Sequence, residues 1–119
     1  KAHEIVDNLV DDGFINDERF ARAYVNDKVG LARWGRKKIY LSLYQKGISR
    51  DLINEAIDNI DAEVYQQNII DLIIAKGKTI DNPGSYEGKS KILRFMMSRG
   101  FESGAVIKML NKPGLWEED

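Results

Sequence analysis

The side chains that most often carry out catalysis or bind metals are nearly absent from this sequence. His3 is the single histidine, and there is no cysteine. Zinc sites and catalytic triads need several such residues at defined positions. The neighbouring carboxylates Asp11 and Asp12 lie on a polar face, where they are expected to be solvated. We therefore expect no enzymatic activity, no metal site and no cofactor.

Basic residues are the other group whose arrangement could do chemistry. From Lys28 to Arg50 there are seven basic residues and no acid, and from Lys89 to Arg99 there are four more. From Asp51 to Asp71 there are six acids and no base. The net charge of −1 conceals this segregation.

Two interpretations of the basic runs remain open. They are solvated helix faces, with charges that interact with helix dipoles. Alternatively, they form a basic stripe that faces a polyanion or an acidic protein surface. On the second interpretation the candidate partner-binding residues are Arg33, Arg36, Lys37, Lys38, Lys46, Lys89, Lys91 and Arg94.

Two helices that could carry this stripe are predicted between Gly35 and Ile60. The first has an apolar stripe at helical spacing and ends at Gly47, which we expect in the left-handed conformation. Ser49 is the predicted N-cap of the second helix. The first stripe contains Ile39, Tyr40, Leu43 and Tyr44, and the second contains Leu52, Ile53, Ala56, Ile57 and Ile60.

The same pattern occurs a second time, 53 residues later, when Gly47 is aligned with Gly100. At this offset Lys38 aligns with Lys91 and Ile39 with Ile92. A match of residue class over such a period indicates a repeat built from one supersecondary unit.

The sequence therefore predicts an all-α fold of tandem three-helix repeats that form an elongated helical array. Residues 1–16 are assigned to the closing helix of an incomplete first repeat, and 115–119 to a tail. Residues 17–60 and 61–114 are the two three-helix repeats, of which the first begins after the N-cap Asn16. Its opening helix is expected to bury Phe20, Tyr24, Val25 and Leu31. No apolar run approaches the roughly 20 residues that span a bilayer.

Trp34 has two interpretations that we keep open. It can pack in the corner between two helices, where Gly35 permits a close approach. It can also be an aromatic platform flanked by Arg33 and Arg36, as in proteins that bind single strands. Tyr40 and Tyr44 lie on the apolar stripe and are expected in the core.

Several motifs resemble the RecX family when they are taken together. They are Phe-Ile-Asn-Asp-Glu-Arg-Phe-Ala-Arg-Ala-Tyr at 14–24, Trp-Gly at 34–35, Lys-Lys-Ile at 37–39 and Gln-Lys-Gly-Ile-Ser at 45–49. The resemblance covers essentially the whole chain and is best from Phe14 to Ile57. The chain departs from a strict repeat in the long loop 78–87 and in Gly-Lys-Ser at 88–90, so the two repeats need not bind alike.

The resemblance implies a cytoplasmic regulator of homologous recombination and DNA repair, including the SOS response. Such a protein binds the RecA nucleoprotein filament and mainly inhibits the recombinase. The resemblance also implies a monomer that needs no cofactor or membrane. The alternative is a helical-repeat protein that binds single- or double-stranded DNA directly, and a third possibility is a helical adaptor.

Overall fold

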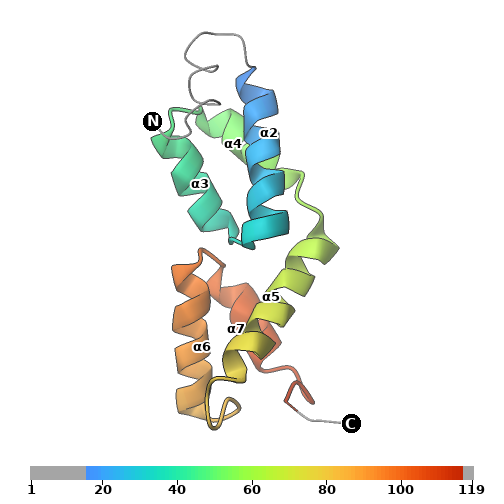
Figure 1. The fold of residues 1–119 in the computed structure, drawn as a ribbon, viewed down its shortest axis with the longest axis vertical. Coiled ribbons are helices and arrows are strands. Elements are labelled where there is room, and N and C mark those ends of the chain that lie inside the picture. Colours follow the sequence, from blue (N-terminus) through green and yellow to red (C-terminus); the bar gives the residue numbers. More distant parts are fainter. Residues whose placement is uncertain (1–15, 117–119) are drawn as a thin grey trace.

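The computed structural model describes residues 16–116, which contain six α-helices, one π-helix and no strand (Figure 1). The predicted all-α fold is confirmed. The elements are α2 (Asp17–Asp27), η1 (Lys28–Ala32), α3 (Arg36–Gln45), α4 (Arg50–Asp58), α5 (Ala62–Gly77), α6 (Tyr86–Ser98) and α7 (Ser103–Leu110). The closing helix expected within residues 1–16 lies almost wholly outside the described residues, as do residues 117–119 of the tail.

Side-chain caps fix where most of these helices begin. The Asn16 carboxamide oxygen accepts the amides of Glu18 and Arg19, and the Ser49 hydroxyl accepts the amide of Leu52. Asp61 and Ser85 cap α5 and α6 in the same way. Each cap satisfies an amide of the first turn that has no partner inside the helix. The predicted caps Asn16 and Ser49 are therefore confirmed.

The predicted left-handed glycines are also confirmed. Gly47 has φ +91° and Gly100 has φ +93°, so each occupies a conformation that costs other residues energy. After each glycine the chain returns to the core, where Ile48 and Phe101 are buried. The same turn therefore connects the second and third helices of both repeats.

Two separate cores lie under the two sets of three helices. Residues at the predicted 53-residue offset are buried alike: Ile39 and Ile92 are both fully buried, and so are Leu43 and Met96. The first core consists of Ala21, Val25, Val29, Ile39, Leu43, Ile48, Ile53, Ala56 and Ile57. The second consists of Tyr65, Ile69, Ile73, Ile92, Met96, Phe101, Val106, Met109 and Leu110.

Two predicted core residues are not in the core. Tyr44 is 50% exposed and Leu31 is 81% exposed. Tyr44 falls at the edge of the α3 stripe, in which Ile39 and Leu43 are fully buried and Tyr40 is partly buried. Leu31 is displaced because the chain forms the π-helix η1 after Asp27, which changes the direction of the following side chains. The spacing of apolar residues alone gave no sign of this π-helix.

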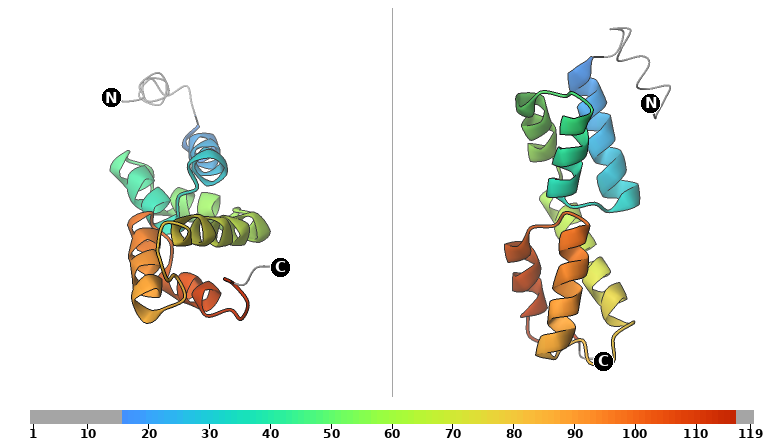
Figure 2. Two further views of the ribbon diagram at one scale, coloured as in Figure 1. Left: turned by 60° about the horizontal axis from the view of Figure 1, so that its bottom comes forward. Right: turned by 90° about the vertical axis from the view of Figure 1, so that its left-hand side faces the viewer.

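The two sets of helices stack end to end in a rod with extents of 53 × 24 × 23 Å. Helices α4 and α7 lie on one side of the rod, and α2 and α5 lie on the opposite side (Figures 1 and 2). Leu115 and Trp116, assigned to a tail from the sequence, pack against the second core. The rod therefore presents equivalent helices of both repeats along the same side.

The rod is held together where the turn at Gly100 meets the start of α3. The amides of Gly35 and Lys37 donate to the carbonyls of Arg99 and Gly100, at 2.8 and 3.0 Å. A Cβ atom at Gly35 would overlap the backbone of Gly100 and Phe101. The close approach predicted for Gly35 is therefore real, and the segment it admits is the turn between α6 and α7 of the other repeat.

Candidate partner-binding surface

The predicted partner-binding residues divide into two groups by exposure. Arg36 and Lys89 are half-buried, and Lys89 donates to the Asn111 side chain at 3.1 Å. The exposed group is Arg33, Lys37, Lys38, Lys46, Lys91 and Arg94. Arg33 also has a left-handed backbone, with φ 55°, in the linker between η1 and α3. Six of the eight residues are therefore open to a partner.

Lysines of the first repeat are held over two aromatic rings. The Lys28 ammonium lies 5.2 Å from the centre of the Tyr24 ring and 4.7 Å from that of Trp34. Lys38 lies over Trp34 at 4.6 Å, and Lys46 over Tyr24 at 5.7 Å. Cation–π contacts of this length are attractive and hold flexible lysines in place. Three ammonium groups, from the start of η1, from α3 and from the residue after α3, therefore converge on one strip of surface.

The second repeat has the same arrangement around one ring. Lys76 lies 5.0 Å from the centre of the Phe95 ring, and the Arg99 guanidinium lies 5.6 Å from it. Arg99 is the equivalent of Lys46 at the 53-residue offset, and Phe95 is the equivalent of Ser42. Because the hydroxyl groups of Tyr24 and Ser42 share a hydrogen bond, Tyr24 lies against the α3 position that Phe95 fills on α6. The aromatic ring is thus supplied by different helices in the two repeats. Of the cations beside it, Lys46 and Arg99 occupy equivalent positions, whereas Lys28 and Lys76 do not.

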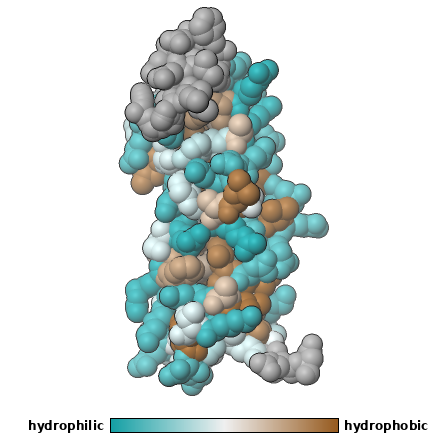
Figure 3. All heavy atoms as spheres, in the orientation of Figure 1, coloured by the Kyte–Doolittle hydropathy of each residue, from teal (hydrophilic) through white to brown (hydrophobic). Residues whose placement is uncertain are grey.

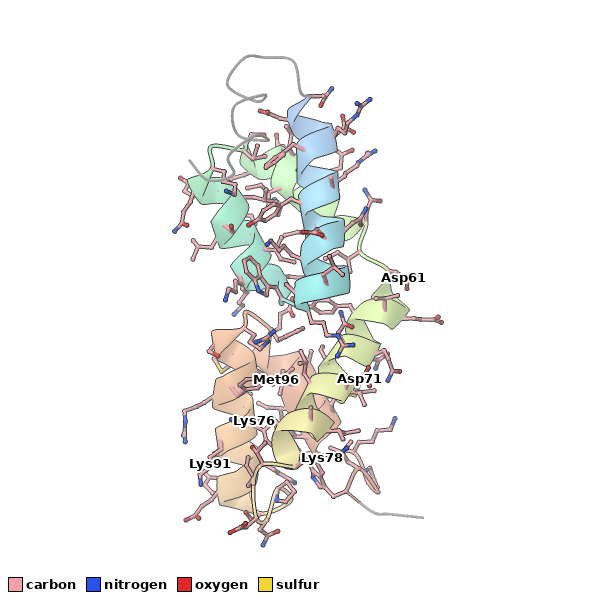
Figure 4. All side chains as sticks on the ribbon, in the orientation of Figure 1. Asp61, Asp71, Lys76, Lys78, Lys91 and Met96 are labelled. Atoms are coloured by element: carbon pink, nitrogen blue, oxygen red, sulfur yellow. The ribbon has the colours of Figure 1, made fainter. Side chains whose placement is uncertain are left out.

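These contacts form one surface, which we call the basic track. Arg99 joins its two parts, because its guanidinium donates to the carbonyl of Ala32 at 2.9 Å, next to the linker that carries Trp34. In Figure 4, Lys76 lies between α5 and α6 in the view, and Figure 3 shows hydrophobic residues among hydrophilic ones on the face turned toward the reader. The basic track consists of Tyr24, Lys28, Trp34, Lys38, Lys46, Lys76, Phe95 and Arg99.

The acids of the predicted acidic run lie on other parts of the helices. The predicted acidic run falls on α4 and the outer side of α5, where Asp71 is on the side away from α6 (Figure 4). Within residues 16–116, the ion pairs join Arg22 to Glu18 and Glu55, and Arg36 to Glu102. The cations of the basic track thus make no ion pair with another described residue.

Lys37 and Lys38 lie on different faces of α3 although they are adjacent in sequence. Lys38 belongs to the basic track. Lys37 lines an open apolar hollow of about 340 Å³ between α3 and α4, together with Arg36, Tyr40, Leu41, Asn54 and Ile57. The basic run that the sequence presents as one patch is therefore divided by the helix between two surfaces.

Arg36 connects the two repeats. Its amide donates to the Tyr65 hydroxyl at 2.9 Å, and its guanidinium contacts Glu102 at 3.2 Å and stacks 4.0 Å from the centre of the Tyr65 ring. The Tyr65 hydroxyl in turn donates to Glu102 at 2.8 Å. Of all the predicted binding residues, Arg36 is therefore the one engaged in an ion pair that joins the two repeats.

The pKa values of this junction follow from burial and from these hydrogen bonds. Burial is the main cause that raises the pKa of the Tyr65 hydroxyl well above its ordinary range. Burial also opposes ionisation of Glu102, but hydrogen bonds from Tyr65 and Arg36 outweigh it and lower the pKa of the Glu102 carboxyl. Glu102 is therefore held as a carboxylate between a neutral tyrosine and a cation.

Trp34 combines features of both interpretations given above. Its ring is half-buried against the first core, as a corner residue would be. The ammonium groups of Lys28 and Lys38 also lie over this ring. Lys28, Lys76 and Arg99 were not among the predicted binding residues. The spacing of Tyr24 to Lys28 and of Phe95 to Arg99, four residues in each case, is a signal that could have pointed to Lys28 and Arg99. Lys76 contacts Phe95 from another helix, so sequence spacing gave no signal for it.

Two features of the described residues bear on the expected site chemistry. Within residues 16–116, no group of three or more His, Cys, Asp or Glu side chains is placed to hold a metal ion. No helix in that part of the chain is both long and apolar enough to cross a membrane.

Comparisons with known proteins agree on one family. The family model for the second three-helix domain of RecX matches residues 16–57. Over 112 residues the chain is 36% identical to the regulatory protein RecX of Clostridium tetani. This match covers 91% of this chain and 50% of that protein. It is 29% identical over 108 residues to the RecX of Clostridioides difficile, covering 91% of this chain and 51% of that protein. The chain thus spans about half the length of the curated relatives it matches.

Solved structures show the same fold. A crystal structure of regulatory protein RecX matches 91% of this chain and 53% of its own, with a TM-score of 0.75 at 22% identity. RecX from Lactobacillus salivarius matches 89% of this chain and 69% of its own, with a TM-score of 0.75 at 23% identity.

Proposed function

Because the chain belongs to the RecX family, we propose that it acts as a regulator of the RecA recombinase. In this proposal it binds the RecA–DNA filament and mainly inhibits recombinase activity, as a cytoplasmic monomer that needs no cofactor. The observation that carries the proposal is the match of both sequence and fold to RecX proteins over nine-tenths of the chain.

The exposed cations are the proposed contact with the filament. Exposed charges contribute little to folding, and most surface substitutions change stability by less than about 0.5 kcal/mol. Across an interface, charges of this kind govern encounter rate and orientation. A surface rich in cations that make no ion pair with other described residues is therefore better explained by a partner than by stability.

The shape of the molecule also supports the proposal. The backbone bonds at Gly35 and Lys37, together with the Arg36–Glu102 ion pair, fix the two repeats at one relative orientation. A rod with a set length can follow a continuous surface and present both repeats to it at once. Two weak contacts that are rigidly linked bind more tightly than either alone, because the second becomes intramolecular.

Charge reversal tests this function. In the full-length protein, we expect the variant Lys37→Glu, Lys38→Glu, Lys91→Glu to melt like the parent and to lose most inhibition of RecA ATPase. The matched control reverses three other exposed lysines, Lys78, Lys108 and Lys112, and should inhibit normally. If the first variant inhibits as strongly as the parent, the cations tested are solvated surface and the filament contact lies elsewhere.

The second candidate function is direct binding to single- or double-stranded DNA. The basic track favours it, since cations interleaved with aromatic rings are typical of surfaces that bind nucleic acid. The overall charge of −1 works against non-specific binding. The two candidates differ in what the chain binds when RecA is absent.

A further inference from the structure

We propose that the basic track binds the phosphodiester backbone of a single nucleic-acid strand, laid lengthwise across both repeats. The inference deepens the proposed function, because a RecA–DNA filament offers phosphates as well as protein. It assigns the contact to residues of α2, η1, α5, α6 and the turn after α6, in addition to the basic residues at α3.

The first support is that the cations are positioned before any ligand arrives. Lys28 and Lys76 are half-buried and lie over aromatic rings at 4.7 to 5.2 Å. A lysine in free solution loses considerable rotamer entropy when it is fixed by a ligand. Here the rings have already restricted the side chains, so a phosphate would meet ammonium groups that are partly ordered.

The second support is that the arrangement is repeated in space although the sequence changes. Lys28 and Lys46 flank Tyr24, and Lys76 and Arg99 flank Phe95. The ring comes from the first helix of one repeat and from the second helix of the other. Packing of the core does not require a ring between two cations in each repeat, whereas a ligand with a repeating charge would meet a similar surface twice.

The third support is that the track runs along the rod. Arg99 lies where the two repeats meet, through its bond to Ala32, and Lys38 lies against the same turn, since a Cβ atom at Gly100 would overlap its side chain. Cations therefore lie on both repeats and at the junction between them. A linear polyanion fits such a surface better than a compact acidic protein, which would touch one end.

A strand fits better than a duplex because of the aromatic rings. Proteins that bind single strands combine backbone contacts with exposed ring surfaces on which bases can stack. Trp34 is only half-buried and Phe95 is likewise partly exposed. Bases of a duplex are stacked on one another and present their edges in the grooves, so rings would contribute little to duplex binding.

The test measures binding of a fluorescent oligodeoxythymidine to the full-length protein by anisotropy, without RecA, over a series of salt concentrations. The parent should show a log–log salt slope of about −3, from four or five phosphate contacts at roughly −0.7 each. In the variant Lys28→Gln, Lys76→Gln, affinity should fall about tenfold and the slope should lose about 1.4.

Matched variants separate the track from general charge. Lys78→Gln with Lys108→Gln removes the same charge from exposed lysines outside the track and should bind within about twofold of the parent. Lys28→Arg with Lys76→Arg keeps the charge and should restore most of the affinity. If the glutamine variant folds poorly, the exposed pair Lys38→Gln with Lys46→Gln replaces it, with the same expected loss.

Several results would overturn the proposal. They are a parent that does not bind the oligonucleotide in a salt-dependent way, and equal losses in the track and control variants. Tighter binding to a duplex of equal length would mean that the ligand is duplex DNA and not a single strand. Equally tight binding of polyglutamate to the track would mean that the ligand is an acidic protein. RecA ATPase, measured in parallel on the same variants, reports on the proposed function, so either proposal can fail while the other stands.

Discussion

Replacement of Gly100 by alanine is the most direct test of how the two repeats are joined. Gly47 and Gly100 have nearly the same φ, +91° and +93°, but different surroundings. An added Cβ at Gly47 meets no described atom within 4 Å, whereas at Gly100 it would overlap the Lys38 side chain and lie 2.5 Å from the Lys38 amide nitrogen. The two substitutions therefore share a backbone cost and differ in crowding at the junction.

The magnitudes follow from these two terms. A left-handed conformation costs alanine about 1 kcal/mol, which is the whole effect expected for Gly47→Ala. Overpacking against a rigid backbone adds about 1–3 kcal/mol, so Gly100→Ala should cost about 2–4 kcal/mol. With an m-value of about 1.5 kcal/mol/M in urea, the midpoints should fall by about 0.7 M and about 1.3–2.7 M.

Urea unfolding followed by circular dichroism measures both effects. Gly104→Ala, where an added Cβ has open space, controls for the intrinsic helix preference of alanine and should be neutral or slightly stabilising. Equal midpoint shifts for Gly47→Ala and Gly100→Ala would refute the argument, because they would mean that α3 moves away from the turn at no cost. A neutral Gly47→Ala would show that the αL cost itself is absent.

Three further predictions concern the same junction. Tyr65→Phe leaves the Arg36 amide and Glu102 without their shared partner and should cost about 1–3 kcal/mol in urea melts. The lowered pKa of Glu102 means that its stabilisation is present above about pH 4.3, its ordinary unfolded value, and is lost as pH falls through the lower folded value; Glu102→Gln should flatten that acid loss. Gly35→Ala should destabilise by overlap with Gly100, and near-parental stability would show that the repeats can separate slightly without penalty.

Much of the fold could be predicted because it depends on residues close together in the chain. Asn16 and Ser49 cap helices through amides two or three residues away. Gly47 and Gly100 end helices through a backbone property of glycine itself. The 53-residue offset then predicted that Ile92 is buried because Ile39 is, since both repeats pack the same face inward.

The candidate site was less predictable because helix geometry divides what the sequence keeps together. Lys37 and Lys38 are neighbours in the chain, yet one lines the hollow between α3 and α4 and the other lies over Trp34. Lys76 lies outside the predicted basic runs, and its role depends on Phe95, a residue of another helix. Tyr44 and Leu31 were assigned to the core because apolar spacing cannot distinguish the centre of a stripe from its edge, or an α-helix from a π-helix.

By itself the sequence determined the helical units, their caps, their glycine turns and their repetition. These features are local, and each depends on the preference of a few consecutive residues for one backbone conformation. The tertiary structure alone decided how the repeats dock, through Arg36, Tyr65 and Glu102, whose contacts span 29 to 66 residues of chain. It also decided which cations share a surface, because that depends on the relative rotation of packed helices, which no short stretch of sequence specifies.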